Sequence, residues 1–280
     1  MDENIMAIDV MNYLFTPEGI DKFFLGSPEM REMVERVGKK PQGCSPDEFI
    51  SQMDEAGYEK ILIASVRMGS YKQRWLGADI TQEEVYKAIR KHTDRLVGLA
   101  TYDPLNIMES VNRIEAAVKE YGFKGVYCHA LGWDIRPDDR RMYPCYMKCI
   151  ELGIPFSMQI GHSLEQMPSE AGRPIYIDKV ALDFPDLTFI ASHTGWPWCE
   201  ELIAMASKHN NVYVDISAHF PRYLDRSLAQ FMDTRGRHKV LFGTNGMGLG
   251  RFKKQFLQLA VKEETKRSVL RENALRVFKL

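Results

Sequence analysis

The chain alternates between short apolar runs and longer amphipathic stretches. Runs such as 61–64 and 187–190 are continuous and rich in β-branched residues, which is typical of strands buried on both faces. Between the runs, apolar residues recur at helical spacing, as in 108–121, and Thr81 with Glu84 three residues later forms a capping-box pattern that predicts a helix start. The pattern predicts eight strands, at residues 5–10, 60–66, 95–101, 124–129, 154–160, 187–193, 211–217 and 239–244.

The spacing of these strands predicts their architecture. From the second strand on they start about 25 to 35 residues apart, which is the length of one strand–helix unit. Eight such units in 280 residues favour an α/β fold of the (β/α)8 barrel type over a doubly wound sheet, and no Gly-x-Gly-x-x-Gly motif follows the first strand. Residues 16–45 are rich in Gly and Pro and are predicted to form a long first loop with a short helix. No linker divides the chain, so we expect a single domain over residues 1–280.

Composition narrows the classes of partner. The chain has 37 Lys and Arg against 38 Asp and Glu, a net charge of −1, which argues against a nucleic-acid binder. No apolar run approaches the roughly 20 residues that a membrane span needs, and the first residues are acidic where a secretory signal would be basic. The five cysteines contain no Cys-x-x-Cys pair, so we expect them to be reduced. We therefore expect a cytoplasmic protein that acts on a small molecule, without nucleic-acid or membrane partners.

Four of the seven histidines follow the predicted ends of four successive strands. Active sites of such barrels lie at the carboxyl ends of the strands. A single histidine at such a position is more often paired with the backbone in a core or loop. Four on one face of a barrel indicate a functional cleft, because imidazoles transfer protons near neutral pH and bind metals. These four candidates are His129, His162, His193 and His219.

Other polar and aromatic residues lie at the same strand ends. Arg67, at the predicted end of the second strand, and Asp103, after the third, are candidates to bind a carboxylate or orient a histidine; an Arg–Asp pair that packs the barrel rim is an equal alternative. Three tryptophans could form an aromatic wall for a flat substrate or simply fill the top of the barrel. They are Trp133, Trp196 and Trp198.

Six segments carry a family resemblance: Pro-Asp-Asp-Arg-Arg-Met-Tyr-Pro at 137–144, Glu-Leu-Gly-Ile-Pro at 151–155, Ile-Asp-Lys-Val-Ala at 177–181, Ala-Ser-His-Thr-Gly-Trp-Pro-Trp at 191–198, Asn-Val-Tyr-Val-Asp-Ile-Ser at 211–217 and Val-Leu-Phe-Gly-Thr-Asn at 240–245. Together they resemble the amidohydrolase superfamily, in particular its amidohydrolase-related branch of hydrolases and non-oxidative decarboxylases. The resemblance covers nearly the whole chain. The most similar subgroup contains 4-hydroxyphenyl-β-ketoacyl-CoA hydrolases.

The resemblance implies a distorted barrel that holds one divalent metal, such as zinc or manganese. In the family the first strand ends in Asp-x-His-x-His, and both histidines bind the metal. Histidines of the fifth and sixth strands, matched here by His162 and His193, bind metal or substrate. An aspartate at the end of the eighth strand binds the metal and accepts a proton from the attacking water.

Three of these metal positions differ in this chain. Met11 and Tyr13 follow Asp9 where the two histidines belong, and Asn245 stands where the aspartate belongs. A thioether and a neutral phenol are poor ligands for zinc or manganese, and an amide cannot serve as a base. We therefore expect no tightly bound catalytic metal. His162 and His193 are expected to be ligands only if a metal is bound.

The first hypothesis is a hydrolase with reworked chemistry that acts on a small, aromatic or carboxylate-bearing substrate. His162 and His193 would be its general acid and base, and Asn245 would donate a hydrogen bond to a developing oxyanion. Non-oxidative decarboxylation of an aromatic acid is the alternative reaction, because it needs no activated water. In either case the residues expected to bind the substrate are Arg67, His129, Trp196 and His219.

Two further hypotheses differ in class. One is a metal enzyme with a rebuilt site made of His162, His193 and either Asp9 or His129, since two histidines and a carboxylate form a workable ligand set. The other is a non-catalytic barrel that serves as a binding or partner subunit. The resemblance also implies a homodimer, because members of the family commonly form dimers.

Overall fold

Eight parallel strands form the centre of the computed structural model, which describes residues 5–38 and 40–280. Hydrogen bonds from Val10 N to Phe242 O (2.9 Å) and from Asn245 N to Met11 O (2.8 Å) join the last strand to the first. The prediction of a single-domain (β/α)8 barrel is therefore confirmed, with all eight predicted strands present. In their order around the barrel they are β1 (Ala7–Tyr13), β2 (Tyr58–Ala64), β5 (Leu96–Thr101), β6 (Val126–Cys128), β7 (Phe156–Gln159), β8 (Phe189–Ser192), β9 (Val212–Asp215) and β10 (Val240–Leu241).

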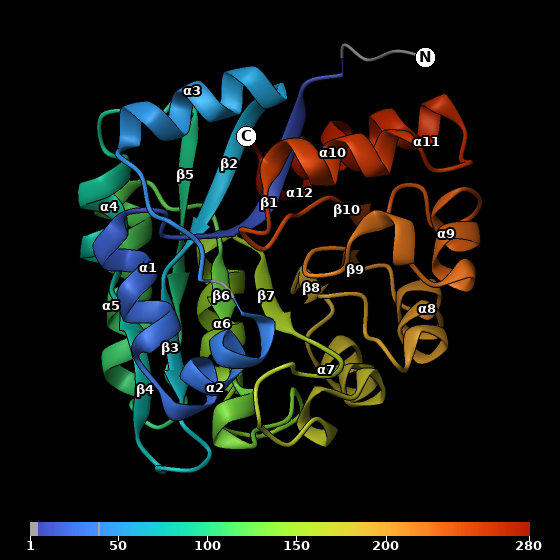
Figure 1. The fold of residues 1–280 in the computed structure, drawn as a ribbon. Helices are drawn as coiled ribbons and strands as arrows, with labels where there is room; N and C mark the ends of the chain where they lie inside the picture. Colours follow the sequence, from blue (N-terminus) through green and yellow to red (C-terminus); the bar gives the residue numbers. More distant parts are fainter. Residues whose placement is uncertain (1–4, 39) are drawn as a thin grey trace.

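Helices surround the strands (Figure 1). The predicted helix at 108–121 is α5, and the predicted capping box starts α4, where Glu84 N donates to Thr81 Oγ1 (3.2 Å) and Thr81 N donates to Glu84 Oε2 (2.9 Å). The helices are α1 (Pro17–Leu25), α2 (Pro28–Val37), α3 (Pro46–Ala56), α4 (Gln82–Ile89), α5 (Ile107–Tyr121), α6 (Tyr143–Leu152), α7 (Ile177–Asp183), α8 (Cys199–Lys208), α9 (Arg226–Met232), α10 (Leu249–Leu257), α11 (Glu263–Arg267) and α12 (Asn273–Phe278).

Alternate strand residues point out to this helical layer and into the barrel. Phe156 and Phe189 point outward, and Tyr146 of α6 packs between them with ring centroids 4.9 and 6.3 Å away. Burying each of these rings stabilises the fold by about 1.5–3 kcal/mol. On β6, Cys128 points to α6, so Tyr127 and His129 on either side of it point into the barrel.

Two sequence-based predictions are wrong: the number of helices in residues 16–45 and the end of the second strand. The region 16–45 contains two helices, α1 and α2, because Ser27 caps a second helix that Pro28 begins. The second strand ends at Ala64 and not at Arg67, because the chain continues into an antiparallel hairpin of β3 (Val66–Gly69) and β4 (Leu76–Ile80). No turn residue separates β2 from β3 in the sequence, so the two strands read as one apolar run.

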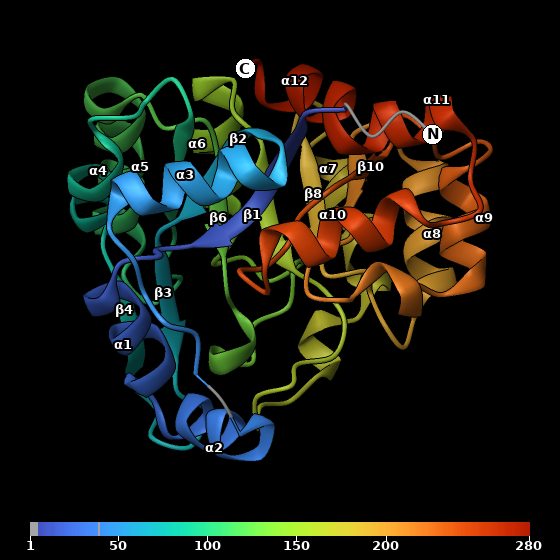
Figure 2. The ribbon, with the colours of Figure 1, turned by 45° about the horizontal axis from the view of Figure 1, so that its top comes forward.

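The strands point towards α1, α2 and the β3–β4 hairpin, and the start of β1 and the C-terminus lie on the opposite side of the barrel (Figures 1 and 2). We call the carboxyl end of the strands the barrel mouth. All five cysteines are free thiols, as expected. Within residues 5–38 and 40–280, none of the helices has the length and apolarity that crossing a membrane requires.

Candidate active site

The four predicted histidines gather at the barrel mouth. His129 follows β6, His162 follows β7, His193 follows β8 and His219 follows β9. His129 and His219 lie close enough to His193 for their charges to lower its pKa, and His162 acts in the same way on the pKa of His219. His129 and His193 are buried, His219 is half-buried and His162 is exposed.

His193 is the centre of a hydrogen-bond network. The chain leaves β8 with a φ of +79° at His193, and the imidazole Nδ1 lies 2.7 Å from Ser217 Oγ. Ser217 in turn donates to Asp215 through its hydroxyl (2.7 Å) and its backbone N–H (2.8 Å). On the other side of the ring, His193 Nε2 lies 3.4 Å from the hydroxyl of Tyr127. Side chains from the ends of β6, β8 and β9 thus meet at one imidazole.

Burial sets the protonation state of this network. It lowers the pKa of His193 to about 3, with smaller contributions from the charges of His219 and His129. It also raises the pKa of Asp215 to about 6, against the effect of the hydrogen bonds from Ser217 and Ser192. At neutral pH the network therefore contains a neutral imidazole and an ionised carboxylate.

Two buried phenols extend the network towards the first strand. The rings of Tyr13 and Tyr127 meet edge to face, with centroids 6.4 Å apart. Tyr13 also stacks on Phe23 of α1 at 4.3 Å. Burial raises the pKa of both phenols far above the ordinary value, and the charges of Glu165 and Asp215 add to this. Both hydroxyls remain protonated at working pH.

His129 is buried without a partner for one ring nitrogen. Its Nδ1 finds no hydrogen-bond partner among the described residues, although the side chain is only 2% exposed. Burial lowers the pKa of His129, and the nearby carboxylate of Glu165 partly offsets this. An unsatisfied buried imidazole costs stability, so this position is a natural place for a ligand contact.

Aromatic side chains border the other two histidines. The Trp196 ring, which is 48% exposed, lies 5.5 Å from the His162 ring and 6.5 Å from the His219 ring between centroids. His162 Nδ1 contacts Ser169 Oγ at 3.0 Å, and His219 Nδ1 contacts Thr194 Oγ1 at 3.2 Å. Trp196 therefore has the exposure that stacking on a flat substrate would need. The other two tryptophans lie within the scaffold. Trp133 packs on Gly69 of β3, and Trp198 is the residue before α8.

Arg67 lies in β3, where three carboxylates surround its guanidinium. Arg67 Nε is 3.1 Å from Asp79, and Nη1 is 3.7 Å from both Asp103 and Glu109. This arrangement favours the alternative of an ion pair that packs the barrel rim. Substrate binding by Arg67 stays a prediction.

Asn245 lies at the mouth beside a small pocket. Its backbone has a φ of +56°, its N–H donates to Met11, and its buried Oδ1 is without a hydrogen-bond partner in the described part of the chain. The pocket has a volume of about 120 Å³, and its wall combines Asn245 and Tyr13 with the aromatic rings of Phe15, Phe24 and Phe49. Its wall is therefore mixed, because aliphatic residues and the side-chain amides of Gln42 and Gln52 stand beside the aromatic rings.

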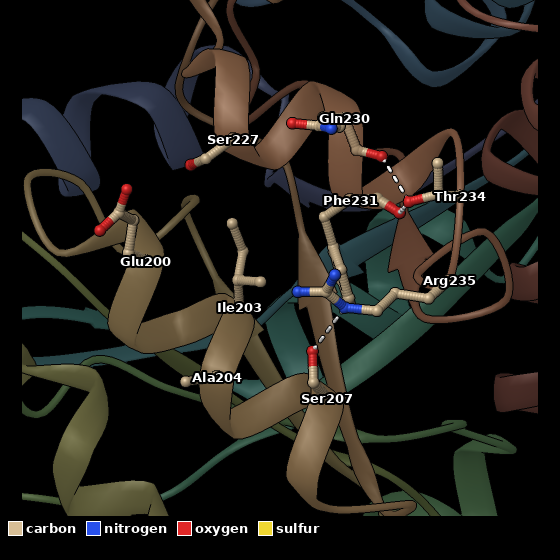
Figure 3. Close-up of a pocket in the computed structure, with 9 residues that line it drawn as sticks. All are labelled: Glu200, Ile203, Ala204, Ser207, Ser227, Gln230, Phe231, Thr234 and Arg235. Carbon is tan, nitrogen blue, oxygen red and sulfur yellow. Dashed lines mark hydrogen bonds between the residues drawn. The ribbon is translucent and has the colours of Figure 1, made fainter.

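A larger surface pocket of about 380 Å³ lies between α8 and α9 (Figure 3). Arg235 Nε donates to Ser207 Oγ there at 3.3 Å, and Glu200 lies on the opposite rim. The predicted site residues are not part of its wall, and it belongs to the outer helical layer. The four predicted histidines lie at the mouth and not in this pocket.

The residues at the mouth do not fit the metal that the family resemblance implies. Asp9 already accepts four hydrogen bonds, from Met11 N, Thr244 N, Thr244 Oγ1 and Asn12 Nδ2, so it has no oxygen left for a metal. Both nitrogens of His193 face hydroxyls, and Tyr13 faces another phenol. Across the described residues, no three His, Cys, Asp or Glu side chains come together in a metal-binding group. That the protein carries no tightly bound metal stays a prediction.

Sequence reasoning missed four residues of this site: Tyr127, Glu165, Asp215 and Ser217. Tyr127 stands two residues before His129 and so shares its face of β6, a signal that the strand period provides. Asp215 and Ser217 form an Asp-x-Ser pattern at a strand end, which is typical of a carboxylate that caps its own turn. Glu165 reaches the mouth from a loop, and the sequence holds no signal for it.

Comparisons with solved structures agree with the barrel. The chain is 23% identical to an uncharacterised TIM-barrel protein from Bordetella bronchiseptica, with a TM-score of 0.78 and 98% of each chain covered. A 5-carboxyvanillate decarboxylase from Novosphingobium aromaticivorans, in complex with manganese and 4-hydroxy-3-methoxy-5-nitrobenzoic acid, is 15% identical, with a TM-score of 0.76 and coverage of 100% of this chain and 97% of the other. A 4-oxalomesaconate hydratase from Rhodopseudomonas palustris is 19% identical, with a TM-score of 0.63 and coverage of 98% and 96%.

The family assignment rests on a sequence match. No curated protein matches the chain. The family model described as amidohydrolase matches residues 28–280, which begin after the first strand and leave Met11 and Tyr13 outside the match. The match covers most of the chain, including seven of the eight barrel strands and the four histidines at the mouth. The chain therefore belongs to the amidohydrolase family.

Proposed function

We propose that the protein is an enzyme that acts on a small aromatic substrate at the barrel mouth by histidine acid–base chemistry. The observation that carries the proposal is the neutral, buried His193, which has a hydroxyl on each ring nitrogen. A pKa of about 3 keeps this imidazole uncharged at neutral pH, so it would pass a proton between its two hydroxyl partners rather than hold a second one. The exposed ring of Trp196 beside His162 supports an aromatic substrate.

A lyase reaction fits these residues better than hydrolysis. Hydrolysis needs an activated water, and the residues that the structure describes at the mouth form no metal-ligand set to generate one. Cleavage of a carbon–carbon bond, such as loss of CO2 from an aromatic acid, needs a proton at the carbon and stabilisation of the anion that forms. His193 would move the proton, and the amide of Asn245 would donate to the anion. The decarboxylases that share the fold support this reaction type.

The test is a substrate screen with matched variants. Purified protein is incubated with a panel of hydroxybenzoic acids, with CO2 release as the readout, and with aryl esters and thioesters, with hydrolysis as the readout. His193→Asn is the site variant, because asparagine tolerates the positive φ at this position but cannot transfer the proton. His92→Asn is the control, because His92 pairs with Asp47 in the turn before β5, at the opposite end of the barrel.

We expect decarboxylation that His193→Asn lowers at least a hundredfold and His92→Asn leaves unchanged. Hydrolysis without decarboxylation would contradict the lyase proposal. Unchanged turnover in His193→Asn would contradict the site. Binding of aromatic acids without any turnover would favour the non-catalytic barrel.

A further inference from the structure

The surface pocket between α8 and α9 has the size of a small-molecule site. Its volume of about 380 Å³ falls within the roughly 300–1,000 Å³ that ligand pockets occupy. The space is open because side chains are small where the two helices face each other, at Ala204 and Ser207 on α8 and at Ser227 on α9 (Figure 3). The wall comes from α8, α9 and the loop after α9, so the pocket is separate from the barrel mouth.

The floor of this pocket is apolar and firmly held. Ile203 of α8 and Phe231 of α9 contribute to it, and they are only 7% and 3% exposed because both also belong to the hydrophobic core. A floor that the core holds in place has its shape before a ligand arrives, so binding orders few side chains. Such a surface suits the hydrocarbon part of a ligand.

Arg235 places a cation at one end of the pocket. Its guanidinium lies over the Phe231 ring, 5.6 Å from the centroid, and its Nε donates to Ser207 Oγ at 3.3 Å. The group points over the floor towards Ile203 (Figure 3). Within residues 5–38 and 40–280, no carboxylate forms an ion pair with it. Its two Nη nitrogens are therefore available to bind a ligand carboxylate in bidentate fashion.

Glu200 places a carboxylate at the opposite end. It precedes Ser207 by seven residues on the same helix, which corresponds to about 10 Å along the axis, and it lies across the floor from Arg235 (Figure 3). In the part of the chain that the structure describes, Glu200 has no ion-pair partner either. Two opposite charges thus border one apolar floor without neutralising each other.

We propose that this pocket is a binding site for a linear zwitterion: a small molecule with a carboxylate for Arg235, an ammonium group for Glu200 and an apolar chain between them. An α-amino acid does not meet this requirement, because both of its charges are attached to one carbon and cannot reach both ends of the pocket. The inference is independent of the proposed function, since the residues of the barrel mouth take no part in it.

The probe is 6-aminohexanoate, and norleucine is its matched control. The two molecules contain the same atoms, but norleucine carries both charges at one end. Titration of the ¹⁵N-labelled protein, followed by amide chemical shifts, gives both the place of binding and the Kd. We expect shifts in α8 and α9, and 6-aminohexanoate should bind about threefold to fivefold more tightly than norleucine, the upper range for one partly exposed ion pair. Hexanoate and hexylamine, which each lack one charge, should be weaker by a similar factor.

Four variants separate the two ends of the pocket. Arg235→Gln should weaken 6-aminohexanoate and hexanoate and leave hexylamine unchanged, whereas Glu200→Gln should weaken 6-aminohexanoate and hexylamine and leave hexanoate unchanged. Arg251→Gln is the control and should match the unaltered protein, because Arg251 also lies over a phenylalanine ring, that of Phe220 at 4.1 Å, but outside the pocket. Ala204→Phe should abolish binding of every probe, because the new ring fills the pocket from an exposed position. Amide shifts outside α8 and α9 report whether each variant is folded.

Three results would overturn the proposal: equal affinity for 6-aminohexanoate and norleucine, shifts at the barrel mouth in place of α8 and α9, or no shifts at all. Equal weakening of hexanoate and hexylamine in Arg235→Gln would also contradict it, because the variant would then have lost the pocket and not one charge. The readout needs no turnover, so a failure of the substrate screen would leave this inference standing.

Discussion

Asp9 offers a quantitative test of how the barrel mouth is held. Its carboxylate joins β1 to the segment after β10 by accepting from Thr244 N (2.9 Å) and Thr244 Oγ1 (2.5 Å), which places Asn245 beside Met11. Burial raises the pKa of Asp9 to about 7 from an ordinary value of 3.8, against the effect of its hydrogen bonds. The folded protein therefore keeps a proton that the unfolded chain releases above pH 4.

The sign and size of the effect follow from this difference. The contribution of Asp9 to stability is complete below pH 4 and is lost as the pH rises through 7, because only the folded state keeps the proton in this window. A difference of roughly three pH units at about 1.36 kcal/mol each corresponds to a loss of about 4 kcal/mol. The side chain in Asp9→Asn cannot titrate. Its amide nitrogen, however, would face Asn12 Nδ2, which is also a donor, so the variant loses this hydrogen bond and about 1–3 kcal/mol of stability.

The order of stability of the variant and the unaltered protein should therefore reverse between low and high pH. We expect Asp9→Asn to be less stable than the unaltered protein at pH 4 and as stable or more stable at pH 8. The assay is urea unfolding followed by circular dichroism at half-unit steps between pH 4 and 8. Asp186→Asn, at an exposed position after α7, is the control and should follow the unaltered protein throughout. A difference that stays constant with pH, or that grows in favour of the unaltered protein as the pH rises, would refute the reasoning.

Three further predictions separate structural roles from ligand binding. Arg67→Gln should lower the free energy of unfolding by about 2 kcal/mol or more, because it leaves buried Asp103 without its cation. The rate of CO2 release from the hydroxybenzoic acids should not change, and a selective loss of this activity would return Arg67 to the substrate site. His129→Leu should raise the unfolding temperature in thermal denaturation, because it removes an unpartnered buried nitrogen at similar volume; a lower unfolding temperature would mean that His129 is a structural residue. Gly69→Ala should destabilise the fold by about 1–3 kcal/mol and shift the fluorescence of Trp133, because a Cβ there would lie 2.4 Å from the indole; unchanged stability would show that the hairpin can move away from Trp133.

Most of the barrel was predictable from the sequence because its strands are buried on both faces. Continuous runs such as 187–190 then mark each strand, and the βα spacing leaves few topologies. The β3–β4 hairpin was not predictable, because β3 continues the apolar run of β2. Because of this hairpin, Arg67 lies at the barrel rim and not at the end of a barrel strand, where the sequence predicted it.

The histidines of the site were predictable, but their environment was not. A strand end places His193 at the mouth, yet only the folded chain brings Ser217 and Tyr127 to its two nitrogens. The same holds for Asp9, whose sequence position suggested a metal ligand and which accepts two of its four hydrogen bonds from Thr244, 235 residues away. Long-range partners of this kind have no signature in the local sequence.

The central claim is that histidine acid–base chemistry has replaced a bound metal at the barrel mouth. Elemental analysis of the purified protein, before and after incubation with zinc and manganese and removal of the excess, tests it most directly. We expect far less than one equivalent of either metal per chain under both conditions, because the donor set at the mouth does not fit one. About one equivalent of tightly held metal that is lost in His193→Asn would contradict the claim and would establish a rebuilt metal site.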